Sequence, residues 1–252
     1  MGTAGAVPVP EDQAGQSFIS RLVGVFLSPG ETFEDVVRKP DFVVPLAVGI
    51  AVAVSATELF LARVDMSAII RWAMEHSSRA ANTPPEQMDQ MVERIAHFQA
   101  IAAHVGGVLW VPVAVLVAGL IGMIALSTVF GGKVSFKTAF SIASYGYLVV
   151  IPETLILSIM VLFGDPQHII SNPQNPAPVT LGFFLDPATT SKPVMSLVSS
   201  VDIFTFWLMA VLSIGFAAAS VRKAKASSMF FLYFGLWVVW ALIKMGLSTL
   251  SG

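Results

Sequence analysis

The chain has 252 residues, of which 55% are hydrophobic and only 12% are charged, and its mean hydropathy is +0.77. This composition is far more apolar than that of an ordinary soluble domain and predicts a membrane protein. The formal net charge of -2 argues against a nucleic-acid-binding surface. The chain contains no cysteine, which excludes disulfides, thiol catalysis, cysteine-ligated zinc and iron–sulfur clusters.

The N-terminal segment, residues 1–16, is rich in Ala, Gly and Pro and includes Glu11 and Asp12. It lacks the basic start and apolar core of a secretory signal. We expect it to be a disordered cytoplasmic tail. Residues 17–252 are expected to form a single membrane domain.

Two short amphipathic helices are predicted before the first membrane-length run. The first has apolar residues at spacings of three and four, at Phe18, Ile19, Leu22, Val25 and Phe26. The second begins at Ser28-Pro29-Gly30-Glu31, with Ser28 as N-cap, Pro29 at the first helical position and Glu31 closing a capping box. Pro40 ends it. We expect the pair to lie in the membrane interface, with a docking surface for a cytoplasmic partner as the alternative.

Five apolar runs follow, and each is long enough to cross a hydrocarbon core of about 30 Å. The predicted fold class is therefore all-α, a polytopic bundle of five transmembrane helices. The five spans are residues 42–62, 104–130, 138–163, 197–219 and 229–250.

The orientation is predicted from basic residues in the short connections. These residues precede span one or lie between spans two and three and between spans four and five: Arg38, Lys39, Lys133, Lys137, Arg222, Lys223 and Lys225. We therefore expect a cytoplasmic (inner) membrane protein with its N-terminus inside and its C-terminus outside. Four arginines in residues 62–103 oppose this orientation, but long connections translocate largely regardless of charge.

The two long external connections differ in kind. Residues 62–103 have helical periodicity with a break at residues 82–86, which predicts an external helical hairpin whose second arm runs into span two. Its apolar stripes fit either mutual packing or a partner site. Residues 164–196 contain six prolines and are expected to form an irregular cap.

The sequence contains no recognisable catalytic motif, phosphate-binding loop or cofactor motif. Glu93, His97 and His104 share a helix face, as some metal ligands do. No further strong ligand lies nearby, so we expect neither a metal nor a cofactor.

Ionisable residues within the spans are the main candidate site. With about 1.5 Å per residue, they fall at a common depth of roughly 22 to 24 Å from the cytoplasmic edge. They are Glu58, Glu153, Asp202 and Lys244. One interpretation is structural: an ion pair of Lys244 with Glu153 or Glu58, and Asp202 at a helix start. The functional alternatives are an outward-facing polar site and an ion pathway.

Span three contains a proline that should interrupt it. Pro152 leaves the carbonyl of Leu148 without its usual helical donor, directly beside Glu153. We expect a bend there, with Glu153 held by a polar contact from span one or span five.

Three local patterns resemble the Ypt-interacting-protein (YIP) family, in particular its bacterial members. They lie before span one, in span three and at the start of span four, and their residues are Pro29, Phe33, Tyr145, Gly146, Tyr147, Pro152, Phe204 and Trp207. The resemblance covers the chain from about Phe18 to the C-terminus and implies a five-span membrane fold.

The functional implications of the resemblance are broad. Eukaryotic relatives bind Rab-type GTPases and typically carry an Asp-Leu-Tyr-Gly-Pro motif, which this chain lacks. Some bacterial relatives are associated with ABC-type exporters and periplasmic adaptor proteins. The resemblance thus implies a non-enzymatic accessory or scaffold protein that contacts lipid and other membrane proteins or forms a homo-oligomer. The alternative is a small transporter that uses Glu58, Glu153, Asp202 and Lys244.

Overall fold

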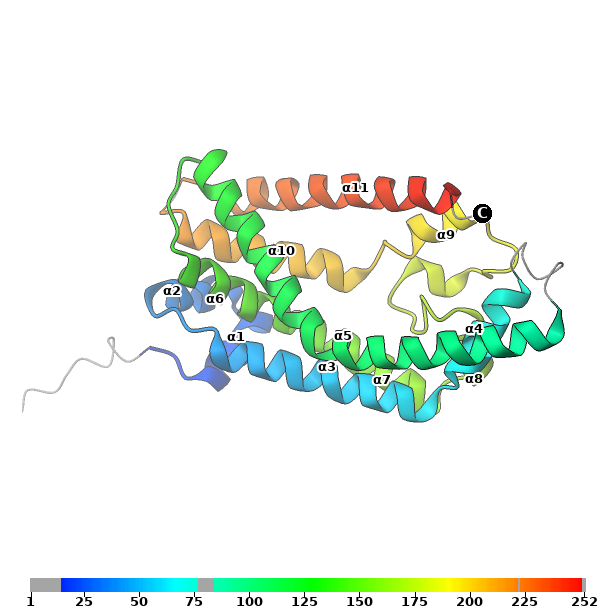
Figure 1. Cartoon of the computed structure of the whole chain (residues 1–252). Helices are drawn as coiled ribbons and strands as arrows, with labels where there is room; N and C mark the ends of the chain where they lie inside the picture. The colour runs from blue at the N-terminus through cyan, green and yellow to red at the C-terminus, as the bar shows by residue number, and fades with distance from the viewer. Residues whose placement is uncertain (1–14, 77–83, 222, 251–252) are drawn as a thin grey trace, which may run out of the picture.

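The computed structural model describes residues 15–76, 84–221 and 223–250. Within these ranges the regular elements are helices, apart from an isolated β-bridge between Thr180 and Asp202. The helices form an elongated bundle, with α1 near one end and the end of α11 near the other (Figure 1). Most of the expected N-terminal tail, part of the expected break at 82–86, Arg79 and Arg222 lie outside the described residues.

The bundle is built from the apolar helices predicted from sequence: α3 (Val43–Arg63), α5 (Pro85–Thr128), α6 (Phe136–Tyr147) followed by α7 (Ile151–Phe163), α10 (Ile203–Ala219) and α11 (Ala226–Leu250). Four helical segments of the described chain are long and apolar enough to cross a membrane: Val43–Arg63, Pro85–Thr128, Phe136–Phe163 and Ala226–Thr249. The remaining helix, α10, has 17 residues, which gives a length of about 26 Å. The predicted all-α membrane bundle is therefore confirmed.

Span four begins later than expected. Leu197 belongs to the end of a separate short helix, α9 (Lys192–Val198), and α10 begins only at Ile203. The carboxylate of Asp202 accepts a hydrogen bond from the Phe204 amide at 2.9 Å and another from Thr205 Oγ1 at 3.1 Å. This cap fixes the start of the helix, because a carboxylate satisfies amides that have no helical partner.

Span three is interrupted next to Pro152, as predicted. A single turn of 3-10 helix, η3 (Leu148–Val150), separates α6 from α7. Proline has no amide proton to offer the Leu148 carbonyl, which instead accepts from the amide of Ile151. The tighter turn thus satisfies the group that Pro152 would otherwise leave unbonded in the bundle interior.

Helix α5 combines the second arm of the hairpin with span two. Its 44 residues give a length of about 66 Å, roughly twice the thickness of a hydrocarbon core. The helix changes direction along its course (Figure 1). Pro112 lies inside the helix, and a proline within a helix favours such a bend because it has no amide proton to donate. The first arm is α4 (Met66–Glu75), which packs on α5 around Ile70, Val92 and Ala96. The predicted helical hairpin is therefore present.

The two N-terminal helices, α1 (Phe18–Leu27) and α2 (Pro29–Arg38), are part of the bundle core. Helix α2 packs against α10 and α6, and Phe33 and Val36 are fully buried there. We expected these helices to lie in the membrane interface, but the structure packs them against the helices of the bundle. Pro29 begins α2 as predicted, but the expected capping box is absent: Ser28 makes no side-chain cap bond, and its carbonyl accepts from Thr32 Oγ1 at 3.0 Å.

The cap between α7 and α10 contains α8 (Pro166–Ser171), η4 (Leu181–Phe184) and α9. A buried amide, Asn175, holds these pieces together. Its Nδ2 donates to Asn172 Oδ1 and to Ser199 Oγ, each at 2.9 Å, while its Oδ1 accepts from Thr180 Oγ1 at 2.8 Å. The six prolines prevent a long helix here, and side-chain hydrogen bonds take over the role of a regular backbone ladder.

Candidate functional site

The predicted intramembrane cluster divides into separate contacts. Glu58 on α3 pairs with His104 on α5, with Oε1 and Nδ1 2.7 Å apart. Both side chains are more than half exposed at the bundle surface. Glu58 therefore pairs with a histidine of the neighbouring helix and not with Lys244, which was one of the two ion pairs that the structural interpretation allowed.

Glu153 and Asp202 do come together. Glu153 begins α7 and is half-buried, and its carboxyl group interacts with the side chain of Asp202. Asp202 is 8% exposed and caps α10, which agrees with the expected role of Asp202 at a helix start. The polar contact to Glu153 thus comes from the segment before α10 and not from span one or span five.

Lys244 on α11 reaches the same region from another side. Its Nζ donates to Ser200 Oγ at 3.1 Å, two residues before Asp202. Within the described chain no carboxylate lies at ion-pair distance from Lys244. In place of the expected ion pair, Lys244 donates to a neutral hydroxyl, and no described side chain compensates the charge of this half-buried ammonium.

The N-terminal helices contain a buried ion pair that was not predicted from the sequence. Arg21 donates from Nε to Asp35 Oδ2 at 2.8 Å and from Nη1 to Asp41 Oδ2 at 3.0 Å, and the Arg21 and Asp35 side chains are each only 3% exposed. Burial works to lower the pKa of Arg21, but Tyr145 and Asp35 more than offset it and raise that pKa. The sequence offered one indication of this ion pair, because Arg21 is the only charged residue of the apolar helix α1.

Tyr145 connects this ion pair to span three. The Arg21 guanidinium carbon lies 5.6 Å from the centre of the Tyr145 ring, and the ring of Phe18 lies 6.4 Å from it. The Tyr145 hydroxyl is buried and interacts electrostatically with Arg21 and Asp41, yet it meets no described group at hydrogen-bond geometry. A cation over an aromatic face stabilises both groups when water is excluded.

The other motif residues lie at helix contacts. Phe33 packs over Gly215, and Gly146 lies so close to Leu212 that an added Cβ would come within 2.8 Å of its side chain. The Trp207 ring contacts Phe26 of α1 edge-on at 5.5 Å and stacks on Phe204 at 6.1 Å. Tyr147 is half-buried beside the η3 turn, and Pro152 lies in the first turn of α7. These residues therefore position helices α1, α2, α6 and α10 against one another.

The side chains of Glu93, His97 and His104 are not brought together as a set of metal ligands. Among the described residues no group of three or more His, Asp and Glu side chains is placed to hold a metal ion. His104 is instead the partner of Glu58.

Apolar helices of membrane length, joined by polar contacts among them, define a multi-pass membrane protein. The family model for the Yip1 domain matches residues 23–244, so the chain belongs to the Yip1 domain family. This match confirms the resemblance to the YIP family as a whole and does not distinguish its bacterial members from the others. Neither the curated proteins nor the solved structures include a match to the chain.

Proposed function

We propose that this chain is a non-enzymatic accessory or scaffold protein of the cytoplasmic membrane that acts through contacts with other membrane proteins. Its membership of the Yip1 domain family and its apolar helices support a membrane-embedded role. The observation that carries the proposal is an uncovered apolar stripe on the hairpin arm of α5.

The stripe lies on the side of α5 that α4 does not cover. Val92 and Ala96 are buried against α4, whereas Met91 is 44% exposed, Phe98 is 69% exposed and Ile101 is 51% exposed. Span two takes only about 20 of the 44 residues of α5, so Met91 and Phe98 lie on the part that extends beyond the apolar segment. Exposed aromatic and methionine side chains in such a position are typical of protein interfaces.

The finer proposal is an auxiliary subunit of an ABC-type export system. With the orientation derived from basic residues, the hairpin extends on the outer side, where periplasmic adaptor subunits lie. Helices α1 and α2 lie at the opposite end and offer a second contact surface to cytoplasmic parts of a transporter (Figure 1). The absence of an identifiable catalytic motif in the sequence agrees with a role through contacts.

The test is site-specific photo-crosslinking in intact membranes, with a crosslinking amino acid in place of Phe98. Its matched control has the same amino acid in place of Ile159, which is 55% exposed on the apolar helix α7. We expect Phe98 to yield an adduct that mass spectrometry identifies as a transporter or adaptor subunit, and Ile159 to yield none. A Phe98 adduct with a second copy of this chain, or no protein adduct, would contradict the export proposal.

A small ion-coupled transporter is the second candidate, favoured by the contact between Glu153 and Asp202. Two carboxyl groups held together among apolar helices repel one another when both are ionised, so one of them readily keeps a proton. In liposomes with a pH-sensitive dye, this candidate predicts a proton flux that Glu153→Gln abolishes. Glu34→Gln, at an exposed position of α2, is the control. A complete lack of flux in the unmodified protein would eliminate this candidate.

A further inference from the structure

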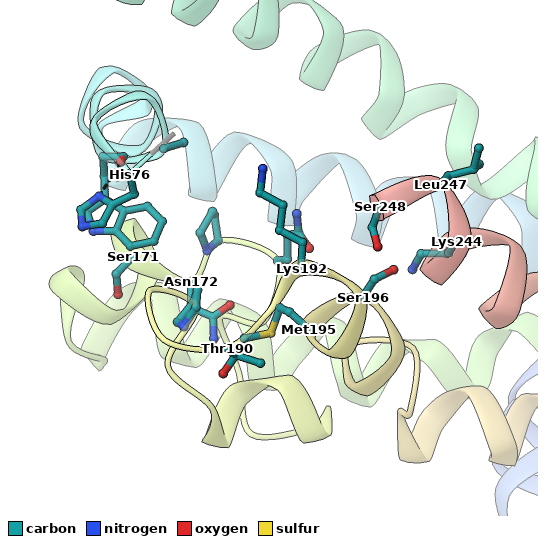
Figure 2. Close-up of a pocket in the computed structure, with 15 residues that line it drawn as sticks. His76, Ser171, Asn172, Thr190, Lys192, Met195, Ser196, Lys244, Leu247 and Ser248 are labelled. Atoms are coloured by element: carbon teal, nitrogen blue, oxygen red, sulfur yellow. Dashed lines mark hydrogen bonds between the residues drawn. The ribbon is translucent and has the colours of Figure 1, made fainter. Parts of the chain in front are cut away.

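A cavity of about 700 Å³ lies at the end of the bundle where α4, the cap and the last turns of α11 meet. Figure 2 shows His76 at one end of it and Lys244 at the other, with α9 contributing Lys192, Met195 and Ser196. Pockets of 300–1,000 Å³ are of the size that holds small ligands. The volume is therefore sufficient for a compact polar group.

The charged side chains among the described lining residues of the cavity are lysines. Lys192 and Lys244 both line it, and His76 adds an imidazole. Among the lining residues that the structure describes, none is Asp or Glu. Hydroxyl groups of Thr190 and Ser196 supply neutral polar contacts. A concave wall with this charge attracts anions, because field lines concentrate within a low-dielectric recess.

Lys244 strengthens this inference. It is half-buried, and its hydrogen-bond partner is the neutral Ser200 hydroxyl, which itself donates to the Ser196 carbonyl. A half-buried ammonium gains considerably from an anion at contact distance. A bound anion would thus supply a compensating charge that the described neighbouring groups do not.

The position of the cavity indicates which anions can reach it. Lys244 and Leu247 lie in the last two turns of α11, a helix of membrane-spanning length, and Leu247 is 58% exposed. The end of such a helix lies near the level of lipid headgroups. The remaining wall includes Trp72 and Met195, which give the recess apolar surface beside its cations.

We propose that this cavity binds a phosphate-bearing anion, with Lys192 and Lys244 as the charged contacts. The anion is either the headgroup of an acidic phospholipid or a soluble phosphate compound. Basic pockets between transmembrane helices bind lipid headgroups by the same electrostatics. This site is independent of the export partner proposed above, because it lies away from the exposed stripe of α5.

The experiment uses the purified full chain in a neutral detergent and measures both its unfolding midpoint and its affinity for three probes. Dihexanoyl phosphatidylglycerol represents the acidic lipid, glycerol 3-phosphate the soluble anion, and dihexanoyl phosphatidylcholine the zwitterionic control. The double variant Lys192→Gln/Lys244→Gln removes both charges. Lys133→Gln, an exposed lysine in the connection between α5 and α6, is the matched control.

We expect an anionic probe to stabilise the protein, and the double variant to bind it at least about tenfold more weakly, since a charge-assisted hydrogen bond contributes that much. A response to phosphatidylglycerol alone assigns the site to lipid, and a response to glycerol 3-phosphate assigns it to a soluble anion. No response to either, or equal affinities for the double variant and Lys133→Gln, overturns the proposal. If the double variant is not monodisperse, Lys192→Gln alone and the charge-conserving Lys244→Arg decide: the first must weaken binding and the second must retain it.

Discussion

The ring of Phe33 on α2 lies directly over Gly215 of α10. A Cβ atom at Gly215 would come within 3.0 Å of Phe33 Cδ1, which is tighter than most real side-chain contacts, and within 2.5 Å of Ile142 Cγ2 on α6. The missing side chain at position 215 therefore lets both α2 and α6 approach α10 closely, and Phe33 is fully buried there.

Replacing Gly215 by valine should push both α2 and α6 away from α10, because the new side chain meets Ile142 and Phe33. Overpacking a core of this kind costs about 1–3 kcal/mol, which corresponds to a midpoint several degrees lower, at about 2–4 °C per kcal/mol. Thermal unfolding in detergent, followed by size-exclusion chromatography, measures the change. Gly235→Ala on α11 is the control, since a Cβ there meets no described atom within 4 Å. Equal midpoints for the two variants would show that the contact is not tight.

Replacing Arg21 by methionine should release the N-terminal helices. Asp35 would remain as a buried carboxylate without its main partner, and such losses cost about 3–5 kcal/mol. Hydrogen–deuterium exchange should show faster exchange throughout α2. Arg38→Met is the matched control, because that side chain is 68% exposed and lies 3.5 Å from Asp35. Unchanged protection of α2 in Arg21→Met would contradict a structural role for the pair.

Replacing Asn175 by alanine should loosen the cap. The change leaves Asn172, Thr180 and Ser199 without the partner that joins them, and each unsatisfied buried group costs about 1–3 kcal/mol. Amide exchange across residues 172–201 should accelerate while α3 remains protected. Thr189→Ala, at an exposed position in the same cap, should change neither region. If the amides of the cap exchange as slowly in Asn175→Ala as in the unmodified protein, its backbone hydrogen bonds alone are sufficient to hold it together.

Replacing Pro112 by alanine should straighten α5. An alanine at position 112 has an amide proton, which can donate to the carbonyl of Val108 as in a regular helix. The bend that Pro112 favours should therefore disappear. Because the chain has no cysteine, spin labels at Gln99→Cys and Ser127→Cys are specific, and both positions are exposed. The interspin distance should lengthen in Pro112→Ala. An identical distance would assign the bend to packing by neighbouring helices.

The helices were predictable because bilayer length and proline chemistry act locally. A run of apolar residues and the missing amide of Pro152 can be read from neighbouring positions. The structure confirms the resulting helices, and it interrupts span three beside Pro152 with a 3-10 turn at Leu148–Val150. The start of span four was harder to predict. Its hydrophobic run begins at Leu197, but the helix begins after Asp202, where a capping carboxylate and not hydropathy sets the boundary.

The polar contacts were less predictable, because charge partners are chosen by packing between distant segments. Depth along the helices placed Glu58 and Lys244 at one level, but depth carries no information about direction around the helix axis. Glu58 faces α5 and finds His104 there, while Lys244 faces the cap. Arg21 and Asp35 lie on separate short helices, and nothing in their spacing shows that both turn inward.

The docking of α2 on α10 also sets an order of assembly. During synthesis the residues of α2 leave the ribosome long before those of α10. Phe33 therefore lacks its packing site at Gly215 until α10 has been made and inserted. Until then the polar contact between Arg21 and Asp35 can join α1 to α2, but their apolar faces lack a counterpart in α10. The N-terminal pair therefore reaches its final place late, and it closes the bundle at that end only after most of the chain has been made.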